Sequence, residues 1–589
     1  MSKPSRPRGT VAPKAAISAL LQQGLALHQS GRPAEAAPYY ERVLAMDAAH
    51  PAANHLLGLV RLAQGRTDEA VRLIARAVAA EGANAQYLGN LGVALNAAGR
   101  NQDAAVALRC ALAINPEFAE AYANLGMALR ALGQVDDAVD AQRSAVGLKP
   151  GEPGFHFNLG NALRDAGDII EAESAYRRAI ALRPNYSAAI NALAMMLDDE
   201  GRSSEALALV EAALRALPDD AQLRMRRARS LRYLNRLEPA VESFDRALEL
   251  NPGFGEAHLQ RSYAVRHEHR DAPIKAMERL FRAEGAPLED RIFVGFGLGK
   301  ALTDLGEHRE AIDVFTEANR LHRQRTPFSL DSARAGLKAD IDRFEGVAAP
   351  LEDAGFREGA PIFVVGLPRS GKTTIEAILA RHPTVAAAGE LPTMGRLVRE
   401  LLAEHPGARA REIPPQRFTE LGRAYMREAE RFVPAGKVPV DTMPSNYRHV
   451  GFIRLALPNA RIVVARRQPA EHCAAIFEKY LTSRGYEYAN DMDELQPYHA
   501  AFGRLIEAWH DRFPGQLHDI DLGSLAADRE GGTRKLLEFC GLDWDSACLV
   551  EQRSEPQYRD WSPDRVAGNH ADHMAAWREV RPQLWDWPA

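Results

Sequence analysis

The sequence predicts two fold classes in one chain: an all-α solenoid of helix pairs, followed by an α/β domain with a parallel sheet. Two observations predict them. Small and helix-breaking residues recur with one fixed period through the first half. In the second half, short apolar runs alternate with helical segments, which is typical of a parallel sheet. The predicted domains are a disordered basic arm at 1–14, the solenoid at 15–325, a helical connector at 326–358 and the α/β domain at 359–589.

Composition is that of an ordinary multidomain globular protein. A chain of 589 residues exceeds one core, and its 46% apolar and 26% charged residues are typical of soluble domains. The net charge of −5 argues against a nucleic-acid-binding role. Four scattered cysteines predict free thiols in a reducing compartment. Because the sequence shows neither a bilayer-spanning apolar stretch nor an apolar signal segment, we expect a cytoplasmic protein.

Glycine, alanine and proline each recur in the first half with a 34-residue period. Their positions are Gly at 31, 65, 99, 133, 167 and 201, Ala at 36, 70, 104, 138, 172, 206 and 240, and Pro at 116, 150, 184, 218 and 252. This pattern predicts a helix–turn–helix unit. Glycine ends the first helix, alanine lets the paired helices approach, and proline opens the turn to the next unit. Leu-Gly pairs at 57–58, 91–92, 125–126 and 159–160 predict a close contact inside the first helix of each unit.

The register changes after the sixth glycine. Asn235 and His269 occupy the next two glycine positions, and Gly306 comes three residues late. We expect a final helix pair between Phe293 and about Arg323, which either caps the stack or docks on the next domain. The array resembles the tetratricopeptide repeat family over roughly residues 15–325. This resemblance implies a groove that binds a protein or peptide partner; a purely architectural solenoid is the alternative.

Residues Gly366–Thr374 form a glycine-bearing turn between an apolar run, Ile362–Val365, and a helical segment from Ile375. Their sequence, Gly-Leu-Pro-Arg-Ser-Gly-Lys-Thr-Thr, fits the GxxxxGKT pattern of a Walker A loop. In a strand–turn–helix of this kind, backbone N–H groups and the helix N-terminus converge on one point and favour phosphate or sulfate. The loop therefore predicts a phosphorylated nucleotide as ligand.

The ends of the other strands bear on which nucleotide binds. Apolar runs predict strands at 362–365, 462–465 and 519–522. A kinase or ATPase needs a carboxylate at a strand end to hold Mg²⁺, but the second strand ends in Arg466 and Arg467. Their guanidinium groups suit a second phosphate instead. Asp441 resembles a metal-binding strand end, although Pro439 weakens that strand; its alternative role is to cap the turn at 444–446.

Further motifs make the second half resemble the sulfotransferase family over about residues 361–550. In chain order they are Phe363-Val-Val-Gly-Leu-Pro-Arg-Ser-Gly371, His382-Pro383, Gly389-Glu390-Leu391, Asp441-Thr-Met-Pro-Ser-Asn446, Gly451-Phe-Ile453, Leu457-Pro-Asn-Ala-Arg-Ile462, Arg466-Arg-Gln-Pro469 and Phe539-Cys-Gly-Leu-Asp-Trp544. The nearest relatives implied are the tyrosylprotein sulfotransferases and bacterial enzymes fused to tetratricopeptide repeats. The resemblance implies 3′-phosphoadenosine 5′-phosphosulfate as co-substrate, no metal, and an acceptor hydroxyl such as that of a protein tyrosine.

The resemblance also implies roles for individual residues. Glu390 occupies the place of the general base, and Arg467 that of the ligand of the 3′-phosphate. Arg369 and Lys372 would also act in catalysis, by neutralising charge on the leaving phosphate. The expected nucleotide-binding residues are Arg369, Ser370, Gly371, Lys372, Thr373, Thr374 and Arg467.

Three positions depart from the family pattern. The chain has Ser370-Gly-Lys-Thr-Thr374 where the family writes SGTT, Thr442 in place of a lysine, and Ala475 in place of a serine. We hypothesise that Lys372 supplies the charge that Thr442 lacks. The missing serine removes one hydrogen bond to the 3′-phosphate, worth roughly 1–2 kcal/mol. Residues 553–570 match the family poorly, although they include Arg559, Arg565 and Asn569 as possible nucleotide contacts.

Two other functions stay open: an ATP-dependent P-loop kinase or NTPase, and a non-catalytic scaffold with a degenerate nucleotide domain. His267 with His269, and His570 with His573, lack further ligands at a recognised metal spacing, so we expect solvated helix faces there and no metal site.

Two groups of aromatic residues in the second half are expected to be structural. Tyr480, Tyr486 and Tyr488 are expected to cover the sheet, with an acceptor cleft as the alternative, and Trp577, Trp585 and Trp587 to anchor the C-terminus.

Overall fold

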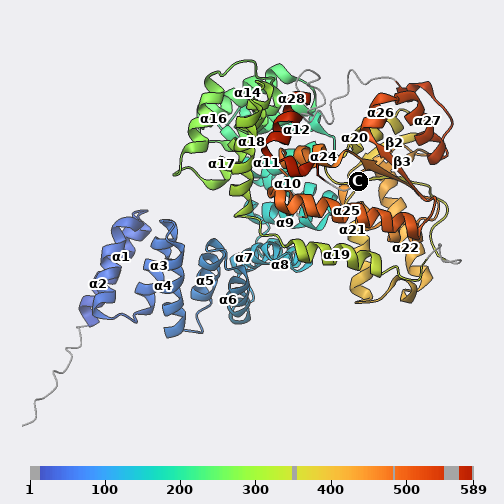
Figure 1. The fold of residues 1–589 in the computed structure, drawn as a ribbon. Helices are drawn as coiled ribbons and strands as arrows, with labels where there is room; N and C mark the ends of the chain where they lie inside the picture. Colours follow the sequence, from blue (N-terminus) through green and yellow to red (C-terminus); the bar gives the residue numbers. More distant parts are fainter. Residues whose placement is uncertain (1–13, 348–353, 482–484, 550–569, 587–589) are drawn as a thin grey trace, which may run out of the picture. The chain divides into compact units, whose positions relative to one another are not determined.

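The computed structural model describes residues 14–347, 354–481, 485–549 and 570–586. It separates into two compact units, residues 1–230 and 231–589, which are described one at a time (Figure 1). The predicted fold class is confirmed, because helix pairs are followed by a parallel five-stranded sheet. Except for Lys14, the predicted basic arm lies outside the described residues. The domain boundaries at 325 and 358 stay predictions.

Antiparallel helix pairs make up the first unit (Figure 1). The helices are Lys14–Gln29 (α1), Pro33–Met46 (α2), Pro51–Ala63 (α3), Thr67–Ala80 (α4), Ala85–Ala97 (α5), Asn101–Ile114 (α6), Ala119–Ala131 (α7), Val135–Leu148 (α8), Pro153–Ala166 (α9), Ile169–Leu182 (α10), Ser187–Asp199 (α11) and Ser203–Leu214 (α12), and Ala221–Tyr233 (α13) runs across the boundary between the units.

The periodic glycines and alanines do what the sequence predicts. All six glycines have left-handed φ values between 72° and 82°, and Asn235 takes the same role at 58°. This conformation ends a helix, and glycine and asparagine adopt it at low cost. The seven periodic alanines are fully buried, because a larger side chain would separate the paired helices. His269 does not continue the series, since its helix ends earlier, at Ala264.

The Leu-Gly pairs also form the predicted close contacts. A Cβ atom added to Gly92 would lie 2.4 Å from Leu108 Cγ, and one added to Gly160 would lie 2.6 Å from Tyr176 Cε1. Gly58 and Gly126 meet side chains of the following helix in the same way, in each case from the residue sixteen positions later. These glycines let the second helix of a pair place a large side chain against the backbone of the first.

Five helices of the second unit precede the connector helix and the sheet. They are Leu237–Leu250 (α14), Gly255–Ala264 (α15), Ala272–Arg282 (α16), Leu288–Asp304 (α17) and His308–Arg323 (α18), followed by α19 at Leu330–Asp342.

A buried ion pair holds the irregular segment after α15. Lys300 Nζ lies 2.5 Å from both Asp304 Oδ2 and Val265 O, and Asp304 Oδ2 also accepts the His267 N–H at 2.9 Å. His267 is therefore 4% exposed. The prediction of a solvated face was wrong for His267 and holds for the exposed His269.

The sheet has the strand order β2-β3-β1-β4-β5, and every pair is parallel. The strands are Ile362–Val365 (β1), Val385–Gly389 (β2), Val438–Asp441 (β3), Arg461–Arg466 (β4) and Leu517–Asp521 (β5). The sequence predicted β1, β4 and β5. It missed the alanine-rich β2, and it underrated β3 because of Pro439. That proline precedes Val440, where the ladder with β1 begins, so its missing N–H costs that ladder nothing.

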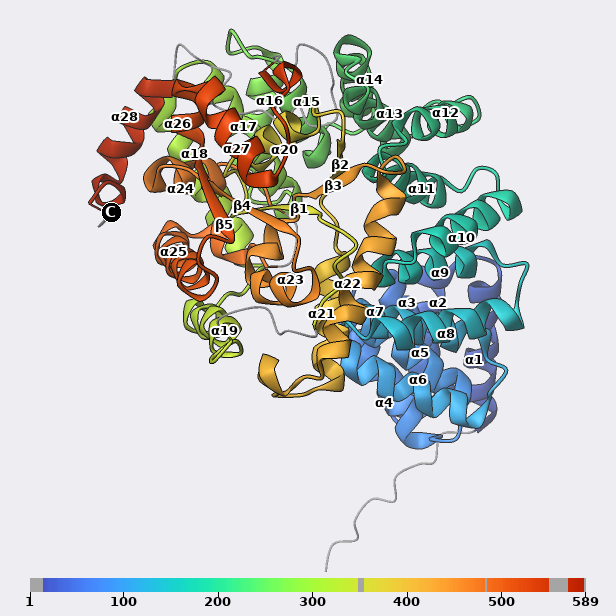
Figure 2. The same cartoon turned by 90° about the vertical axis from the view of Figure 1, so that its right-hand side faces the viewer.

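Helices cover both faces of the sheet (Figure 2). Ile362, Val364 and Val463 face α20 (Lys372–Leu379), α26 (Leu522–Ala527) and α27 (Arg529–Cys540). Phe363 and Val464 face the larger core on the other side. The helices of that side are α21 (Thr393–Glu404), α22 (Pro415–Ala429), α23 (Val450–Ala456), α24 (Pro469–Phe477) and α25 (Met492–Arg512). Short 3₁₀ segments lie at Ala410–Glu412, Glu430–Phe432, Pro444–Arg448, Glu487–Asn490, Ser546–Leu549 and Pro582–Leu584.

The final helix pair docks on the α/β part of its own unit. Asn319 Nδ2 of α18 donates to Phe477 O at the end of α24, at 2.8 Å. Arg323 forms a two-pronged ion pair with Glu494 of α25. Tyr480 packs against Phe293 and Phe296 of α17, so it covers the helix pair and not the sheet. Of the two expectations for this pair, docking is the one found.

The aromatic residues after α24 divide between core and surface. Tyr488 is 1% exposed and stacks on Tyr498 with ring centroids 3.9 Å apart, as a core residue should, whereas Tyr486 is half-buried. Trp577 is 1% exposed, as predicted, and Trp585 packs partly buried. Trp587 lies outside the described residues.

The last helix, His570–Val580 (α28), is anchored on Glu478, the residue after α24. The buried Glu478 Oε1 accepts hydrogen bonds from His573 Nε2 and Trp577 Nε1, both at 2.6 Å. His573 also lies 3.1 Å from His308 of α18. It is 1% exposed, so the predicted solvated face was wrong here, because this histidine pairs with a buried carboxylate.

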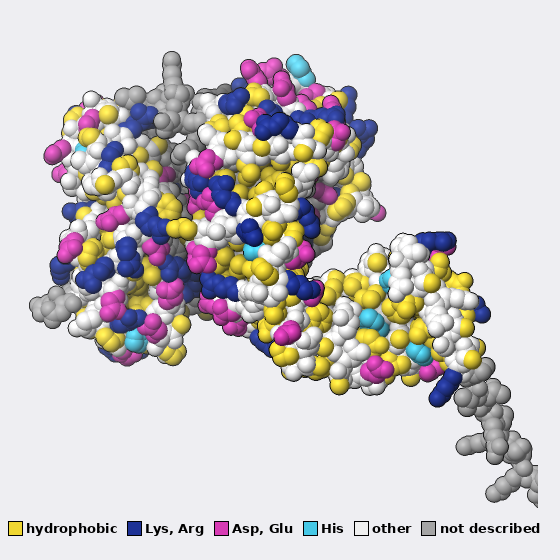
Figure 3. Space-filling view, turned by 180° about the vertical axis from the view of Figure 1, so that it is seen from behind, with side chains coloured by type: hydrophobic (Ala, Val, Ile, Leu, Met, Phe, Trp, Pro, Cys, Tyr) yellow, Lys and Arg dark blue, Asp and Glu magenta, His cyan; other side chains and the backbone are white. Residues whose placement is uncertain are grey.

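On the face that Figure 3 shows, Lys and Arg side chains are interspersed with Asp and Glu over the helices. No helix of the described ranges combines the length and apolar character needed to cross a membrane.

Substitutions of glycine test the close contacts in the helix pairs. Gly160→Ala should destabilise the first unit, because overpacking costs about 1–3 kcal/mol and exceeds the gain of about 0.5–1 kcal/mol from alanine's helix propensity. Gly147 in α8 has open space around it, so Gly147→Ala is the matched control and should stabilise. Calorimetric melting temperatures should fall for the first variant and rise for the second. A rise for both would contradict the contact.

The anchor of α28 should depend on pH. Burial alone would lower the pKa of His573, but the charge and the hydrogen bond of Glu478 outweigh burial and raise it. The stabilisation is therefore fully present below about pH 6.5, the unfolded pKa, and is lost as pH rises through the higher folded pKa. We expect His573→Gln to cost about 1.5–3 kcal/mol at pH 6 and less at pH 9. Equal losses of melting temperature at both pH values would show that His573 is neutral in the fold.

Candidate active site

The loop between β1 and α20 is shaped by two glycines that tolerate no side chain. A Cβ on Gly366 would lie 2.6 Å from Ser370 Oγ and 3.0 Å from Ala465 O, at the end of β4. A Cβ on Gly371 would lie 2.8 Å from Leu522 Cδ2, at the start of α26. Gly371 has φ 93° and Arg369 has φ 66°, so two loop residues are left-handed. The turn is thus fixed by contacts with the ends of other strands.

The start of α20 offers unpaired donors to an anion. Within the described ranges, the amides of Gly371, Lys372 and Thr373 donate to no acceptor. The hydroxyl of Ser370 is fully buried and also lacks a partner there. The first amides of any helix are unpaired and carry its positive end. These donors fit a phosphate or sulfate group, as the loop sequence predicts.

Lys372 brings a buried positive charge to this turn. Its side chain is 6% exposed, and Nζ donates to Leu367 O at 3.1 Å. Burial lowers the pKa of Lys372 to about 8, against the opposing effect of the nearby Glu390 charge. The side chain is therefore mainly cationic at neutral pH. Thr373 and Thr374 follow on the exposed side of α20, and Arg369 is half-buried.

Two carboxylates accompany Lys372. Glu390 follows β2 directly and is exposed, and its charge acts on both Lys372 and Tyr486. Glu376, one turn beyond Lys372, is 5% exposed and accepts the Gly389 N–H at 3.1 Å. Burial raises the pKa of Glu376 to about 7. Glu376 was not among the predicted site residues; the signal in the sequence was an acid four residues after the loop lysine, on the same helix face.

Arg466, the last residue of β4, and Arg467, which follows it, have different surroundings. Arg466 pairs with Asp519 of β5 at 2.9 Å. The side chain of Arg467 is 7% exposed and lies 3.7 Å from Glu471 of α24. Because β4 is the parallel neighbour of β1, Arg467 follows a strand that ends at the same sheet edge as the anion loop. Ala475 is buried on α24 and offers no hydroxyl.

Asp441, at the end of β3, is occupied by protein donors. Its Oδ1 accepts from Met443 N at 2.8 Å and Leu391 N at 3.3 Å, and its Oδ2 from Tyr425 Oη at 2.9 Å and Asn446 Nδ2 at 3.1 Å. Burial raises the pKa of Asp441 to about 6, although these hydrogen bonds lower it. The alternative role as a turn cap is confirmed. The neighbouring Thr442 donates its N–H to Gly389 O at 2.9 Å.

Several predicted residues and groups fall outside these contacts. Arg559, Arg565 and Asn569 lie outside the described residues. No cluster of three or more His, Cys, Asp or Glu side chains in the described ranges has a geometry suited to a metal ion. The four cysteines are free thiols, as predicted.

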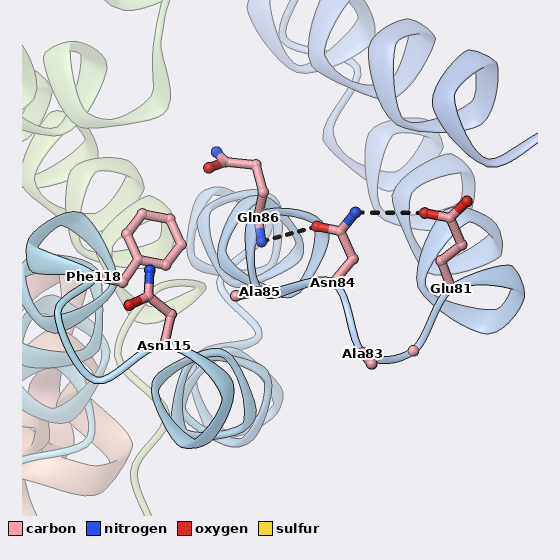
Figure 4. Close-up of a pocket in the computed structure, with 8 residues that line it drawn as sticks. Glu81, Ala83, Asn84, Ala85, Gln86, Asn115 and Phe118 are labelled. Atoms are coloured by element: carbon pink, nitrogen blue, oxygen red, sulfur yellow. Dashed lines mark hydrogen bonds between the residues drawn. The ribbon is translucent and has the colours of Figure 1, made fainter.

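The first unit has a hollow of its own, of about 650 Å³, between neighbouring helix turns (Figure 4). Asn84 caps α5 there by accepting the amides of Gln86 and Tyr87, and its Nδ2 lies 3.5 Å from Glu81. Asn115 and Phe118 of the next turn complete the lining. The hollow contains helix caps and one aromatic ring, with nothing that resembles the loop at 366–374.

Comparisons with known proteins agree with both halves of this description. Residues 361–546 match the family model described as "Sulfotransferase family". Models described as "Tetratricopeptide repeat" match residues 27–91, 90–153, 153–186 and 221–254.

A curated relative is an uncharacterized protein of Aquifex aeolicus (strain VF5), 27% identical over 328 residues. The match covers 53% of this chain and 43% of that protein, so the chain spans less than half of the relative's length.

Similar solved structures match a smaller part of the chain. A tetratricopeptide repeat protein from Parabacteroides merdae ATCC 43184 is 18% identical with a TM-score of 0.35, covering 40% of this chain and 94% of that one. The MamA fragment "41-end" from Desulfovibrio magneticus RS-1 is 20% identical with a TM-score of 0.28, covering 30% and 99%. Together with the family models, the fold identifies the chain as a tetratricopeptide-repeat protein whose C-terminal half carries a domain of the sulfotransferase family.

Proposed function

We propose that the protein is a sulfotransferase that moves a sulfuryl group from 3′-phosphoadenosine 5′-phosphosulfate to an acceptor hydroxyl, with tyrosine in a protein partner as the first acceptor to test. One observation carries the proposal. Unpaired amides and the buried Lys372 cation lie together in the anion loop, and the buried side chain of Arg467 follows β4, the strand next to β1. On the other side of β1, the carboxylate of Asp441 at the end of β3 already accepts hydrogen bonds from protein donors. This arrangement suits a nucleotide with phosphates at two places on its ribose.

The loop residues would hold the 5′ end of the donor and Arg467 the 3′-phosphate. Arg369, Lys372 and the unpaired amides of Gly371, Lys372 and Thr373 would provide charge and N–H donors to the 5′ end, and a guanidinium grips phosphate oxygens in two places. The unpaired Ser370 hydroxyl adds a further donor. When bound, the donor supplies an activated sulfuryl group whose leaving group is a phosphate.

The side chains around the loop would act on both sides of the transfer. Glu390 would accept the proton of the acceptor hydroxyl, which for tyrosine has a pKa near 10, and so strengthen it as a nucleophile. Lys372 and the helix-end amides would stabilise the charge that develops on the departing phosphate. The remaining contribution is positioning of donor and acceptor for in-line transfer.

A kinase or NTPase is less well supported by the geometry of Asp441. A P-loop kinase uses a strand-end carboxylate to hold Mg²⁺. Both oxygens of Asp441 already accept two hydrogen bonds each from protein donors, so a metal would have to displace them. The scaffold alternative would leave the buried Lys372 charge and the unpaired Ser370 hydroxyl without a purpose.

The repeats would supply the partner. Tetratricopeptide arrays use their grooves for protein and peptide recognition, and the proposal assigns them the task of bringing the acceptor to Glu390. This role follows from the resemblance of residues 15–325 to the tetratricopeptide repeat family, which implies a protein or peptide partner.

Nucleotide preference tests the proposal. Adenosine 3′,5′-bisphosphate at 100 times its Kd should stabilise the protein by about 2.7 kcal/mol, with or without EDTA, and ADP should stabilise it less. Arg467→Met should weaken this effect, whereas Arg466→Met, at the arginine paired with Asp519, is the matched control and should not. Thermal-shift titration measures each of these cases. A stronger response to ADP with Mg²⁺, abolished by EDTA, would favour the kinase instead.

Lys372 and Thr442 test the proposed exchange of charges. Lys372→Ala should lower turnover about 100- to 1000-fold, the cost of one lost transition-state donor, while bisphosphate binding survives. The double variant Lys372→Ala, Thr442→Lys should recover part of the turnover, because it restores the lysine that the family places after the aspartate. Transfer of labelled sulfuryl to a tyrosine peptide measures both. Near-normal turnover of the single variant would refute the exchange.

A further inference from the structure

Two buried histidines form a hydrogen-bonded chain that ends on the anion loop, and the proposed reaction gives them no task. His472 of α24 is 2% exposed, and its Nε2 lies 2.9 Å from Pro368 O. Its Nδ1 lies 3.0 Å from Nε2 of His499 on α25. The two rings are nearly perpendicular, at 88°. These hydrogen bonds thus connect α25, through α24, to the backbone of the anion loop.

The partners of His472 determine where its proton sits. A carbonyl oxygen only accepts, so Nε2 of His472 must carry the hydrogen, and in a neutral ring Nδ1 then accepts from His499 Nε2–H. Burial lowers the pKa of His472 well below its usual range, and the charges of Arg467 and Lys372 add to this. Burial also lowers the pKa of His499 to about 4, with Arg466 acting in the same direction. Both rings are therefore neutral at pH 7, with one assigned tautomer each.

The carbonyl that His472 holds belongs to a peptide group within the anion loop. The C=O of Pro368 and the N–H of Arg369 belong to one planar peptide group and point in opposite directions. Holding Pro368 O toward α24 therefore fixes the direction of the Arg369 N–H. The preceding carbonyl, Leu367 O, is held by Lys372 Nζ at 3.1 Å. Two successive loop carbonyls are thus fixed by side chains of two different helices.

This restraint acts where the loop is strained. Arg369 has φ 66°, a left-handed conformation that costs a residue with a side chain roughly 1–2 kcal/mol. Such a conformation persists only when its surroundings impose it. His472 and Lys372 contact the two residues immediately before Arg369, so they are placed to impose it.

We propose that His472, oriented by His499, is a positioning residue that holds the anion loop in its left-handed form and so preorganises the amides for the nucleotide. The proposal rests on the proposed function, because the nucleotide is the ligand that reports on the loop. His472 itself does not touch the reacting groups. The alternative is that the histidine pair only stabilises the fold. The two explanations differ in whether a substitution of His472 lowers the affinity for the bisphosphate beyond what its effect on the melting temperature explains.

Two substitutions of His472 separate these readings. Glutamine can donate its amide N–H to Pro368 O and accept from His499, whereas leucine fills the space without hydrogen bonds. His472→Leu should weaken the binding of adenosine 3′,5′-bisphosphate about 5- to 30-fold, which corresponds to the cost of one left-handed residue at tenfold per 1.4 kcal/mol. His472→Gln keeps both hydrogen bonds, so its affinity for the bisphosphate should stay within about threefold of that of the wild type, a difference of less than about 1 kcal/mol.

Controls keep the result interpretable. His518→Leu removes a histidine of β5 that stacks on Phe539, away from the loop, and should lower stability without changing the affinity. Affinity is measured by calorimetric titration and stability by melting temperature. Should His472→Leu fail to fold, His499→Phe serves as the second variant; it removes the orienting donor, leaves His472 in place and should also weaken binding, while His499→Gln should not.

The outcomes distinguish the two proposals. A wild type that does not bind the bisphosphate contradicts the proposed function. A wild type that binds, together with leucine and phenylalanine variants of equal affinity, overturns the role of the histidines alone. A glutamine variant as weak as the leucine variant would also overturn it, since the hydrogen bonds would then be irrelevant.

Discussion

The direction of a few peptide groups between β1 and α20 is the constraint on which the site depends. Amides attract an anion only if they point at one place, and here that direction is imposed from outside the loop. Gly366 packs closely against Ala465 O of β4, and Gly371 packs closely against Leu522, which follows β5. The parallel sheet supplies these contacts because β1, β4 and β5 all end at one edge. The loop is therefore a property of the whole sheet edge, although its motif is only nine residues long.

Lys372 and the neighbouring carboxylates of Glu376 and Glu390 contribute to the charge at this edge. Lys372 is mainly charged at neutral pH, whereas burial brings the pKa of Glu376 to about 7. A proton on Glu376 leaves the surroundings of Lys372 more positive, and its loss adds a negative charge there. Glu390 differs because it is exposed and stands at the end of β2. Its exposure leaves the carboxylate accessible, as the proposed role of general base requires.

How much the sequence predicted depends on the distance over which each contact acts. The repeats were predictable because their units use local contacts, with a glycine facing a side chain sixteen residues later in four of them and a left-handed residue after the first helix of a pair. The anion loop was predictable because its residues are contiguous. Glu376 and His472 were missed, since their partners Gly389 and Pro368 lie 13 and 104 residues away in the chain. Pro439 misled the strand prediction because a ladder's register decides whether its N–H is needed, and register is not visible in a sequence.

The helix α24 connects these distant contacts. Its first turns follow Arg467 and carry His472, so its start is held against the anion loop. At its end, Phe477 O accepts from Asn319 of the final helix pair, and Glu478 accepts from His573 and Trp577 of α28. A nine-residue helix is stiff over this length. The final helix pair and α28 are therefore joined through α24 to the residues around the anion loop. The contacts of α18 with α24 and α28 account for the departure of the final repeat from the periodic sequence.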